Sequence, residues 1–377
     1  MSESGECGPM PGNRVFEALR NEKSIIMACN TRIVPGVVKG IFRAAKKLDT
    51  AVIFELAKSE SDLKGGYTGL TPQDYSDAVH GAAREVGFSK WVLHADHITV
   101  KKGTEEEIED VKKLIEAQIN AGYTSYAIDA SFLFDLDESS VVGQLQRNID
   151  VTTKLANFIK EKMGGREFGL ECEVGEIGKK NKEGLVLTKV EEAATFIKEL
   201  NARDIHPQLL AIANGSTHGN IYDEAGNVIE QVSINVDMTV EIAKEIEPLG
   251  VRIAQHGITG TPLRFINTRF PRGLILKGNV GTFWMNLAWE VFDIYEPELY
   301  GDIFNWTIDT YKEAAEKKGI TKNNEIFGKY SKFAIKEFKD RIYSVQDETK
   351  DVLEAKAYAE AMMFFKAFGS VGTASKL

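Results

Sequence analysis

The stretch WVLHADHITV, residues 91–100, is an apolar run that ends in two histidines and an aspartate. A short run of this kind, rich in β-branched and aromatic residues, is typical of a buried strand. The whole chain contains only six histidines. The grouping of His94 and His97 around Asp96 therefore indicates that the end of this strand carries a function. We expect the apolar part to form one strand of a larger sheet and the polar end to lead into a loop.

Similar runs recur along the chain, and each is followed by a segment with helical periodicity. The eight runs are SIIMACN (24–30), AVIFELA (51–57), KWVLHAD (90–96), SYAIDAS (125–131), FGLECEVG (168–175), LLAIANG (209–215), VRIAQHG (251–257) and GLILKGNV (273–280). Strand followed by helix, eight times over, predicts an α/β fold of the (β/α)8 TIM-barrel type. A doubly wound sheet is the competing architecture, but the first strand lacks the GxGxxG turn of a dinucleotide fold.

After residue 282 the pattern changes to long helical stretches rich in aromatic and charged residues. These stretches predict a C-terminal helical extension of the barrel. We therefore expect an N-terminal segment with a first helix at 1–23 and a catalytic barrel at 24–285. Residues 286–377 are expected to form outer and C-terminal helices packed on the barrel.

The composition excludes several classes of protein. The chain has 377 residues, 43% hydrophobic, with a net charge of -10, which argues against a nucleic-acid partner. No apolar run reaches the roughly 18 residues that a membrane span needs. Three cysteines, Cys7, Cys29 and Cys172, form no CxxC pair and suggest neither a disulfide framework nor a thiolate zinc site. We expect a cytoplasmic protein with no membrane partner.

Histidines at the ends of several predicted strands point to a metal site. Reactive groups of such barrels lie at the C-terminal ends of the strands. His94 and His97 lie at the end of the third strand, His218 follows the sixth, and His256 ends the seventh. Neutral imidazoles that converge without cysteine suit zinc or a related divalent ion with an open position for substrate.

Carboxylates occupy the same strand ends. Asp96 precedes His97, and Asp129 ends the fourth strand. Glu171 and Glu173 are two apart on the fifth strand and therefore face the same side. If that side is the interior, only Glu173 lies near enough to the C-terminal end to reach the mouth. The alternative for each of these charges is a lysine partner or a solvated position at the rim.

Glycine-rich turns follow the last three strands, at 218–220, 256–260 and 277–282. In barrels, a phosphate commonly binds in these loops through backbone N–H groups that glycine leaves accessible. The turns also contain Lys277 and the hydroxyl residues Thr259 and Thr282. Together they predict an anion-binding site.

The motifs HADH, ECEVGEIG, NGSTHG, HGITGTP and KGNVGT, in this order, resemble those of the class II, metal-dependent fructose-bisphosphate aldolase family. The resemblance covers about residues 24–285. It implies that Asp96 is the general acid/base and that Asn279 contacts the enediolate. For the loop after the fifth strand, where the family carries a second acid/base, Glu183 is the nearest candidate and Glu176 another.

The resemblance also implies which residues bind metal and substrate. The metal ligands would be His97, His218 and His256, with Glu173 and Asp129 near the ion. The substrate and its phosphate would be bound by Asn30, Gly219, Gly257, Thr259 and Asn279, beside the Lys277 and Thr282 already assigned to the anion site.

The expected activity is that of an aldolase dependent on Zn²⁺ or another divalent metal, with a monovalent cation as a further candidate cofactor. The expected reaction is the reversible cleavage of fructose 1,6-bisphosphate to dihydroxyacetone phosphate and glyceraldehyde 3-phosphate. The alternatives are another ketose phosphate such as tagatose 1,6-bisphosphate, a barrel metallohydrolase or sugar isomerase, and a noncatalytic barrel subunit. The expected partners are a sugar phosphate and further copies of the chain in a homodimer or homotetramer.

Two departures from the family pattern bear on the substrate. Ala57 stands where the family commonly has serine, and Gly281 stands where it usually has aspartate. Loss of that carboxylate removes a hydrogen-bond acceptor for sugar hydroxyls. We expect Gly281 to leave room in the site and to relax the specificity for the aldehyde.

Overall fold

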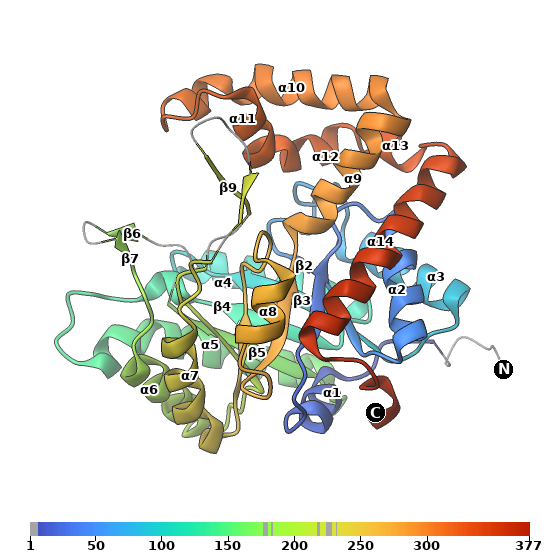
Figure 1. Cartoon of the computed structure of the whole chain (residues 1–377). Coiled ribbons are helices and arrows are strands. Elements are labelled where there is room, and N and C mark those ends of the chain that lie inside the picture. The colour runs from blue at the N-terminus through green and yellow to red at the C-terminus, as the bar shows by residue number, and fades with distance from the viewer. Residues whose placement is uncertain (1–6, 176–179, 182–183, 217–218, 224–227, 231) are drawn as a thin grey trace.

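The computed structural model describes all residues except 1–6, 176–179, 182–183, 217–218, 224–227 and 231. Eight parallel strands close into a barrel in the order β1-β12-β11-β8-β5-β4-β3-β2, which confirms the predicted fold (Figure 1). The strands are β1 (Ile26–Asn30), β2 (Val52–Ala57), β3 (Trp91–Thr99), β4 (Ser125–Asp129), β5 (Gly169–Val174), β8 (Leu209–Ile212), β11 (Arg252–Gln255) and β12 (Ile275–Val280).

A helix follows each barrel strand along the chain. These helices are α2 (Val37–Leu48), α3 (Pro72–Val86), α4 (Glu105–Asn120), α5 (Val141–Met163), α6 (Val190–Asn201), α7 (Val236–Ile246), α8 (Leu263–Arg269) and α9 (Thr282–Tyr295). Local signals fix several ends: α3 begins at a capping box between Thr71 and Asp74 and ends at the left-handed Gly87. Two short antiparallel pairs interrupt the alternation, β6 (Lys180–Asn181) with β7 (Gly184–Leu185) and β9 (Ile221–Tyr222) with β10 (Val228–Ile229).

The interior of the barrel has an apolar layer and, nearer the carboxyl ends of the strands, a polar one. Side chains alternate along a strand, so neighbouring residues of one strand face the barrel interior and the outer core in turn. The apolar layer contains Ile26, Ala28, Ile53, Val92, Leu209, Ala211, Ala254 and Leu276. The buried polar layer contains Asn30, Glu55, His94, Asp96, Glu171, Glu173, Lys277 and Asn279.

Helix α1 (Gly12–Leu19) closes the amino-terminal end of the barrel. Its side chains Val15, Phe16 and Leu19 are buried in the apolar layer. Gly12 allows the close approach, since a Cβ there would lie 2.7 Å from the Cβ of Ser125. The backbone N–H of Gly12 donates to the carbonyl of Thr124 at 3.0 Å.

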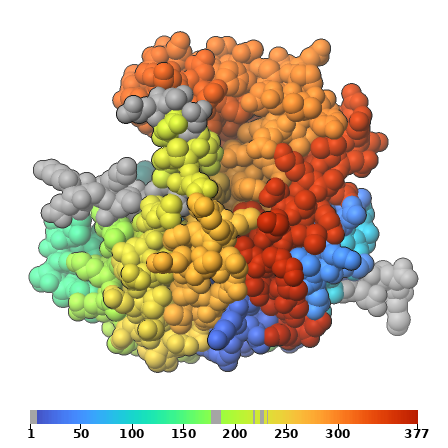
Figure 2. All heavy atoms as spheres, viewed as in Figure 1, coloured from blue at the N-terminus to red at the C-terminus, as the bar shows by residue number. Residues whose placement is uncertain are grey.

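The chain after the barrel is helical, as predicted. It forms α10 (Pro297–Glu316), α11 (Asn323–Tyr330), α12 (Ala334–Glu337), α13 (Lys339–Tyr343) and α14 (Asp347–Phe368). In Figure 1, α10 to α13 form a roof over the barrel, and α14 returns along its side to pack against α2. In Figure 2 the orange atoms of the roof lie above the barrel, and the yellow-green atoms around β9 reach up to them. No helix in the described ranges is both long and apolar enough to cross a membrane.

Candidate active site

A bulge at the end of β3 brings two adjacent side chains to the same site. Neighbouring residues of a regular strand point to opposite faces, but the pairing of β3 with β4 shifts between Ala95 and Ile98. Within the bulge His97 has a positive φ of 40°. As a result both Asp96 and His97 line a cavity of about 520 Å³ at the carboxyl end of the barrel.

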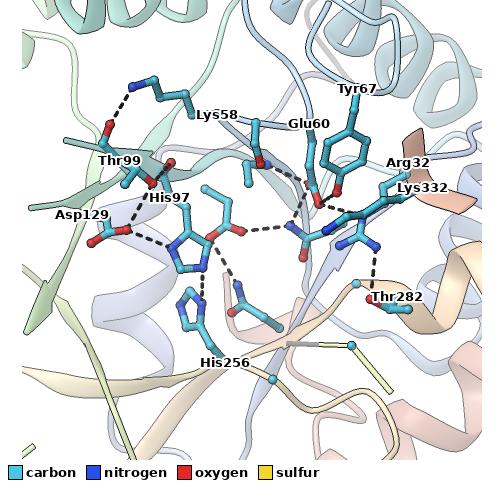
Figure 3. A pocket seen from close by; sticks show the side chains of 18 of the residues that line it. Arg32, Lys58, Glu60, Tyr67, His97, Thr99, Asp129, His256, Thr282 and Lys332 are labelled. Atoms are coloured by element: carbon cyan, nitrogen blue, oxygen red, sulfur yellow. Dashed lines mark hydrogen bonds and ion pairs between the residues drawn. The ribbon is translucent and has the colours of Figure 1, made fainter. Parts of the chain in front are cut away.

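His97 and His256 face each other across this cavity. The Nε2 atom of His97 lies 2.8 Å from the Nδ1 atom of His256 (Figure 3). The other nitrogen of each ring faces a carboxylate: His97 Nδ1 is 3.1 Å from Glu173, and His256 Nε2 is 2.7 Å from Glu171. Such carboxylate contacts orient imidazoles so that the opposite nitrogen can bind a metal.

Asp129 joins Glu173 beside His97, with its Oδ2 atom 3.5 Å from His97 Nδ1. Burial and the charge of Asp129 raise the pKa of Glu173 to about 8. Burial alone lowers the pKa of His97, but Asp96, Glu173 and Asp129 outweigh it and raise that pKa well above its ordinary value. The concentration of buried negative charge favours a cation at this site.

The donor set fits a divalent metal. Asp96, His97 and His256 each offer a ligand atom, and these atoms lie within 4.8 Å of one another; His97, Asp129 and Glu173 form a second such group. Nitrogen and carboxylate ligands without cysteine suit zinc and its neighbours.

Asp96 is held by amide groups from two other strands. Asn30 at the end of β1 donates to Asp96 Oδ2 at 2.9 Å, and Asn279 of β12 donates to Oδ1 at 3.3 Å. Burial would raise the pKa of Asp96, but His97, Lys277 and His256 outweigh it and lower that pKa below its usual range. Asp96 is therefore an oriented carboxylate that can accept a proton.

Lys277 does not line the cavity, and the prediction that it binds substrate phosphate is wrong. Its side chain is fully buried below the site, with Nζ 2.8 Å from Glu171 and 3.0 Å from Glu55. The physical reason is depth: Lys277 lies two residues before Asn279 on β12 and hence about 7 Å lower in the barrel. His94 lies in the same buried layer, 3.4 Å from Glu171.

The predicted anion-binding residues, apart from Lys277, do line the cavity. Gly219, Gly257, Thr259 and Thr282 border it, and both glycines have positive φ, 83° and 67°. The Thr259 hydroxyl accepts a hydrogen bond from the N–H of Phe283 at 3.3 Å. Glycine at these turns exposes backbone without a Cβ, which suits an oxyanion.

A second cluster on the cavity wall was not predicted from the sequence. Glu60 accepts hydrogen bonds from Arg32 Nε at 2.7 Å, from the Tyr67 hydroxyl at 2.8 Å and from Asn30 at 3.3 Å (Figure 3). Lys332, from the roof, lines the same side of the cavity. Asn30 was predicted as a substrate-binding residue, whereas Arg32, Glu60 and Lys332 are single charges without motif spacing that no sequence signal marks.

Gly281 lines the cavity, but part of the room expected beside it is taken by Arg32. A Cβ at Gly281 would lie 3.3 Å from Arg32 Nη2, so a guanidinium occupies that side of the site. Arg32 Nη1 also donates to the Thr282 hydroxyl at 3.1 Å. This side of the cavity therefore carries a positive charge where the family usually has a negative one.

Three predicted residues lie outside the described part of the chain. His218 was expected as a metal ligand, and Glu183 and Glu176 as candidates for a second acid/base. Their roles stay predictions.

Comparison with known proteins supplies a family and a fold. A family model described as fructose-bisphosphate aldolase class-II matches residues 11–343. The D-tagatose-1,6-bisphosphate aldolase subunit GatZ of Salmonella gallinarum is 31% identical over 106 residues, 26% of this chain and 25% of that protein. The chain thus spans about a quarter of the length of the curated relatives it matches.

Two solved structures share the fold across almost the whole chain. The YdjI aldolase from Escherichia coli K12 is 17% identical, with a TM-score of 0.61 over 97% of this chain and 99% of that chain. The fructose-bisphosphate aldolase (Fba) from Campylobacter jejuni is 18% identical, with a TM-score of 0.61 over 97% of each chain. At these identities the likeness shows the fold alone.

Proposed function

The chain belongs to the class II fructose-bisphosphate aldolase family, and on that premise we propose that it is a zinc-dependent enzyme that reversibly cleaves a ketose bisphosphate. Fructose 1,6-bisphosphate, giving dihydroxyacetone phosphate and glyceraldehyde 3-phosphate, is the first substrate to test, and tagatose 1,6-bisphosphate the second. The observation that carries the proposal is the grouping of Asp96, His97 and His256 in one cavity.

The metal would be held by His97 and His256, with His218 as the third ligand and with Asp129 and Glu173 beside His97. When bound, such an ion acts as a Lewis acid that stabilises negative charge on the ketone oxygen of the substrate. The contact between Glu171 and His256 Nε2 fixes which nitrogen of His256 remains for the ion.

Asp96 would transfer the proton. In the cleavage direction its carboxylate takes the proton from the hydroxyl on the carbon that becomes the aldehyde, and in the synthesis direction it returns that proton. Asn30 and Asn279 fix the carboxylate through their amide N–H groups. The Oδ1 atom of Asn279 is buried and has no hydrogen-bond partner among the described residues, which suits a contact with the enediol hydroxyls. We assign the second proton transfer, at the ketone half, to Glu183.

The substrate phosphate would bind at Gly219, Gly257, Thr259 and Thr282. Backbone N–H groups at glycine turns and threonine hydroxyls are donors that a phosphate accepts. We further propose that the protein forms a homodimer or homotetramer, and that a monovalent cation is a second cofactor to test. A location in the cytoplasm is proposed because all three cysteines are free thiols.

Metal content gives the first test. His97→Ala and His256→Ala are each expected to lower zinc affinity at least tenfold while the barrel stays folded, because its apolar core does not involve the ion. His206→Ala, at an exposed histidine outside the cavity, is the matched control. Zinc analysis and circular dichroism of the purified proteins measure both effects. Wild-type zinc content in both cavity variants would contradict the assignment.

Turnover gives the second test. Asp96→Asn is expected to retain zinc and to lower kcat about 10²-fold or more, the usual contribution of a positioned proton-transfer group. The assay follows cleavage of fructose and tagatose bisphosphates with and without chelator. If Asp96→Asn cleaves as fast as the wild type, another group transfers the proton.

A noncatalytic subunit is the alternative function, since the matched curated protein is named as an aldolase subunit. The same assay separates the two. If the purified protein binds zinc but by itself cleaves neither bisphosphate, the result would support the role of a noncatalytic subunit.

A further inference from the structure

Two cations from distant parts of the chain meet on one wall of the cavity. Arg32 follows β1, and Lys332 belongs to the roof that lies after the barrel. Both lie near the ring of Tyr67: the Arg32 Cζ atom is 5.9 Å and the Lys332 Nζ atom 5.6 Å from its centre. Figure 3 draws them side by side, beside Thr282.

The two cations share one carboxylate. Glu60 pairs with Arg32 at 2.7 Å, whereas no carboxylate of the described residues forms an ion pair with Lys332. Within this group of three side chains, the two positive charges therefore share a single negative charge. Burial and the nearby Arg32 lower the pKa of Lys332, so the ammonium would gain stabilisation from an anion.

This wall is continuous with the predicted phosphate turns. Arg32 Nη1 donates to the Thr282 hydroxyl at 3.1 Å. A Cβ on Gly219 would lie 4.0 Å from that same hydroxyl oxygen. The Nη2 atom of Arg32 points to Gly281 and makes no hydrogen bond among the described residues. Donors from the turns and from the two cations therefore border one space.

We propose that Arg32 and Lys332 bind the phosphate of the ketone half of the substrate and select a phosphorylated ketone over an uncharged one. The proposal rests on the aldolase function for the identity of the substrate. A guanidinium and an ammonium favour a dianion strongly over a hydroxyl, because charge-assisted hydrogen bonds are about twice as strong as neutral ones. Lys332 makes the roof part of the substrate site.

Binding of inorganic phosphate to the chelator-treated protein tests the proposal without any turnover. Lys332→Met is expected to weaken phosphate binding about tenfold, since one charged hydrogen bond is lost, and Lys332→Arg is expected to restore most of it. Lys322→Met, which removes the same charge from an exposed position of the roof outside the cavity, is the matched control. Titration calorimetry at fixed ionic strength measures all four proteins.

The selectivity is measured in the synthesis direction, as the ratio of kcat/KM for dihydroxyacetone phosphate to that for dihydroxyacetone. Lys332→Met is expected to lower this ratio, and Arg32→Lys, which keeps a charge for Glu60 but loses the planar fork, is expected to lower it as well. Phosphate binding in Lys332→Met equal to that in Lys322→Met would overturn the proposal. If phosphate binding depends on Lys332 but no bisphosphate is cleaved, the aldolase function fails and the anion site stands.

Discussion

The ammonium of Lys277 lies between the carboxylates of Glu171 and Glu55, at 2.8 and 3.0 Å, in a layer without solvent. Glu171 also accepts the Nε2 proton of His256. Lys277 thus neutralises the group that orients a predicted metal ligand. A buried charge that loses its partner costs far more than the intact pair contributes.

The first prediction concerns the replacement of Lys277, a single residue. Lys277→Met is expected to lower the free energy of unfolding by about 3–5 kcal/mol, since it removes the cation shared by three buried carboxylates, those of Glu171, Glu55 and Asp96. The double variant with Glu55→Gln is expected to recover part of that loss. Urea denaturation of the single and double variants measures both. If Lys277→Met unfolds at the wild-type midpoint, the buried ion pairs do not contribute to stability.

Individual residues show which parts of the site could be predicted from the sequence. His97, His256 and Asp96 were predicted because histidines and carboxylates at strand ends converge in any barrel. The prediction that Lys277 binds phosphate was wrong because it rested on the motif KGNVGT, and a motif does not show how deep in the barrel a residue of β12 lies. Arg32, Glu60 and Lys332 were not predicted, since their meeting depends on how the roof folds back over the barrel.

At the scale of elements, the eight strands were predictable because each is a local run with two buried faces. The bulge of β3 was not, because a register shift depends on the partner strand β4. The packing of α14 on α2 was also not predictable in detail. It joins helices about 300 residues apart in sequence, and it depends on small residues at the point of contact.

The contact between α2 and α14 provides the second prediction. A Cβ on Gly40 would lie 2.9 Å from the Cβ of Ala357 and would overlap the carbonyl of Glu354. Gly40→Ala is therefore expected to lower stability by about 1–3 kcal/mol. Gly81→Ala, in α3 with nothing near its Cβ position, is expected to raise stability by up to about 1 kcal/mol through helix propensity.

Thermal or urea unfolding of both alanine variants measures this contrast. Equal midpoints for Gly40→Ala and Gly81→Ala would mean that α14 does not unfold together with the barrel.

At the scale of the whole molecule, the roof contacts the loops of the site through β9. Gly328 of α11 lies against the hydroxyl of Tyr222, the last residue of β9, and a Cβ on Gly328 would overlap that hydroxyl. The Lys329 ammonium lies 5.9 Å from the centre of the Tyr222 ring. Gly219, shortly before β9 in the chain, lines the cavity. We therefore expect the position of the roof to influence the predicted phosphate turn.

Gly328→Ala is the prediction that follows. The added methyl group is expected to displace β9 from α11 and to raise the KM for the bisphosphate several-fold, with a small change in unfolding midpoint. Gly301→Ala, in α10 with open space at its Cβ position, is the control. Steady-state kinetics of both variants measure the effect, and an identical KM in the two would show that the contact does not reach the site.

The closure of the barrel floor by α1 has a kinetic consequence. Val15, Phe16 and Leu19 fill the amino-terminal end with buried side chains, so a molecule bound in the cavity can enter and leave only through the carboxyl end, beneath the roof. A product that is still bound near this end obstructs the departure of one that lies deeper. If the chain cleaves a sugar as proposed, we therefore expect the two halves to leave in a fixed order, set by how deep each is held, even if the chemistry treats both halves alike.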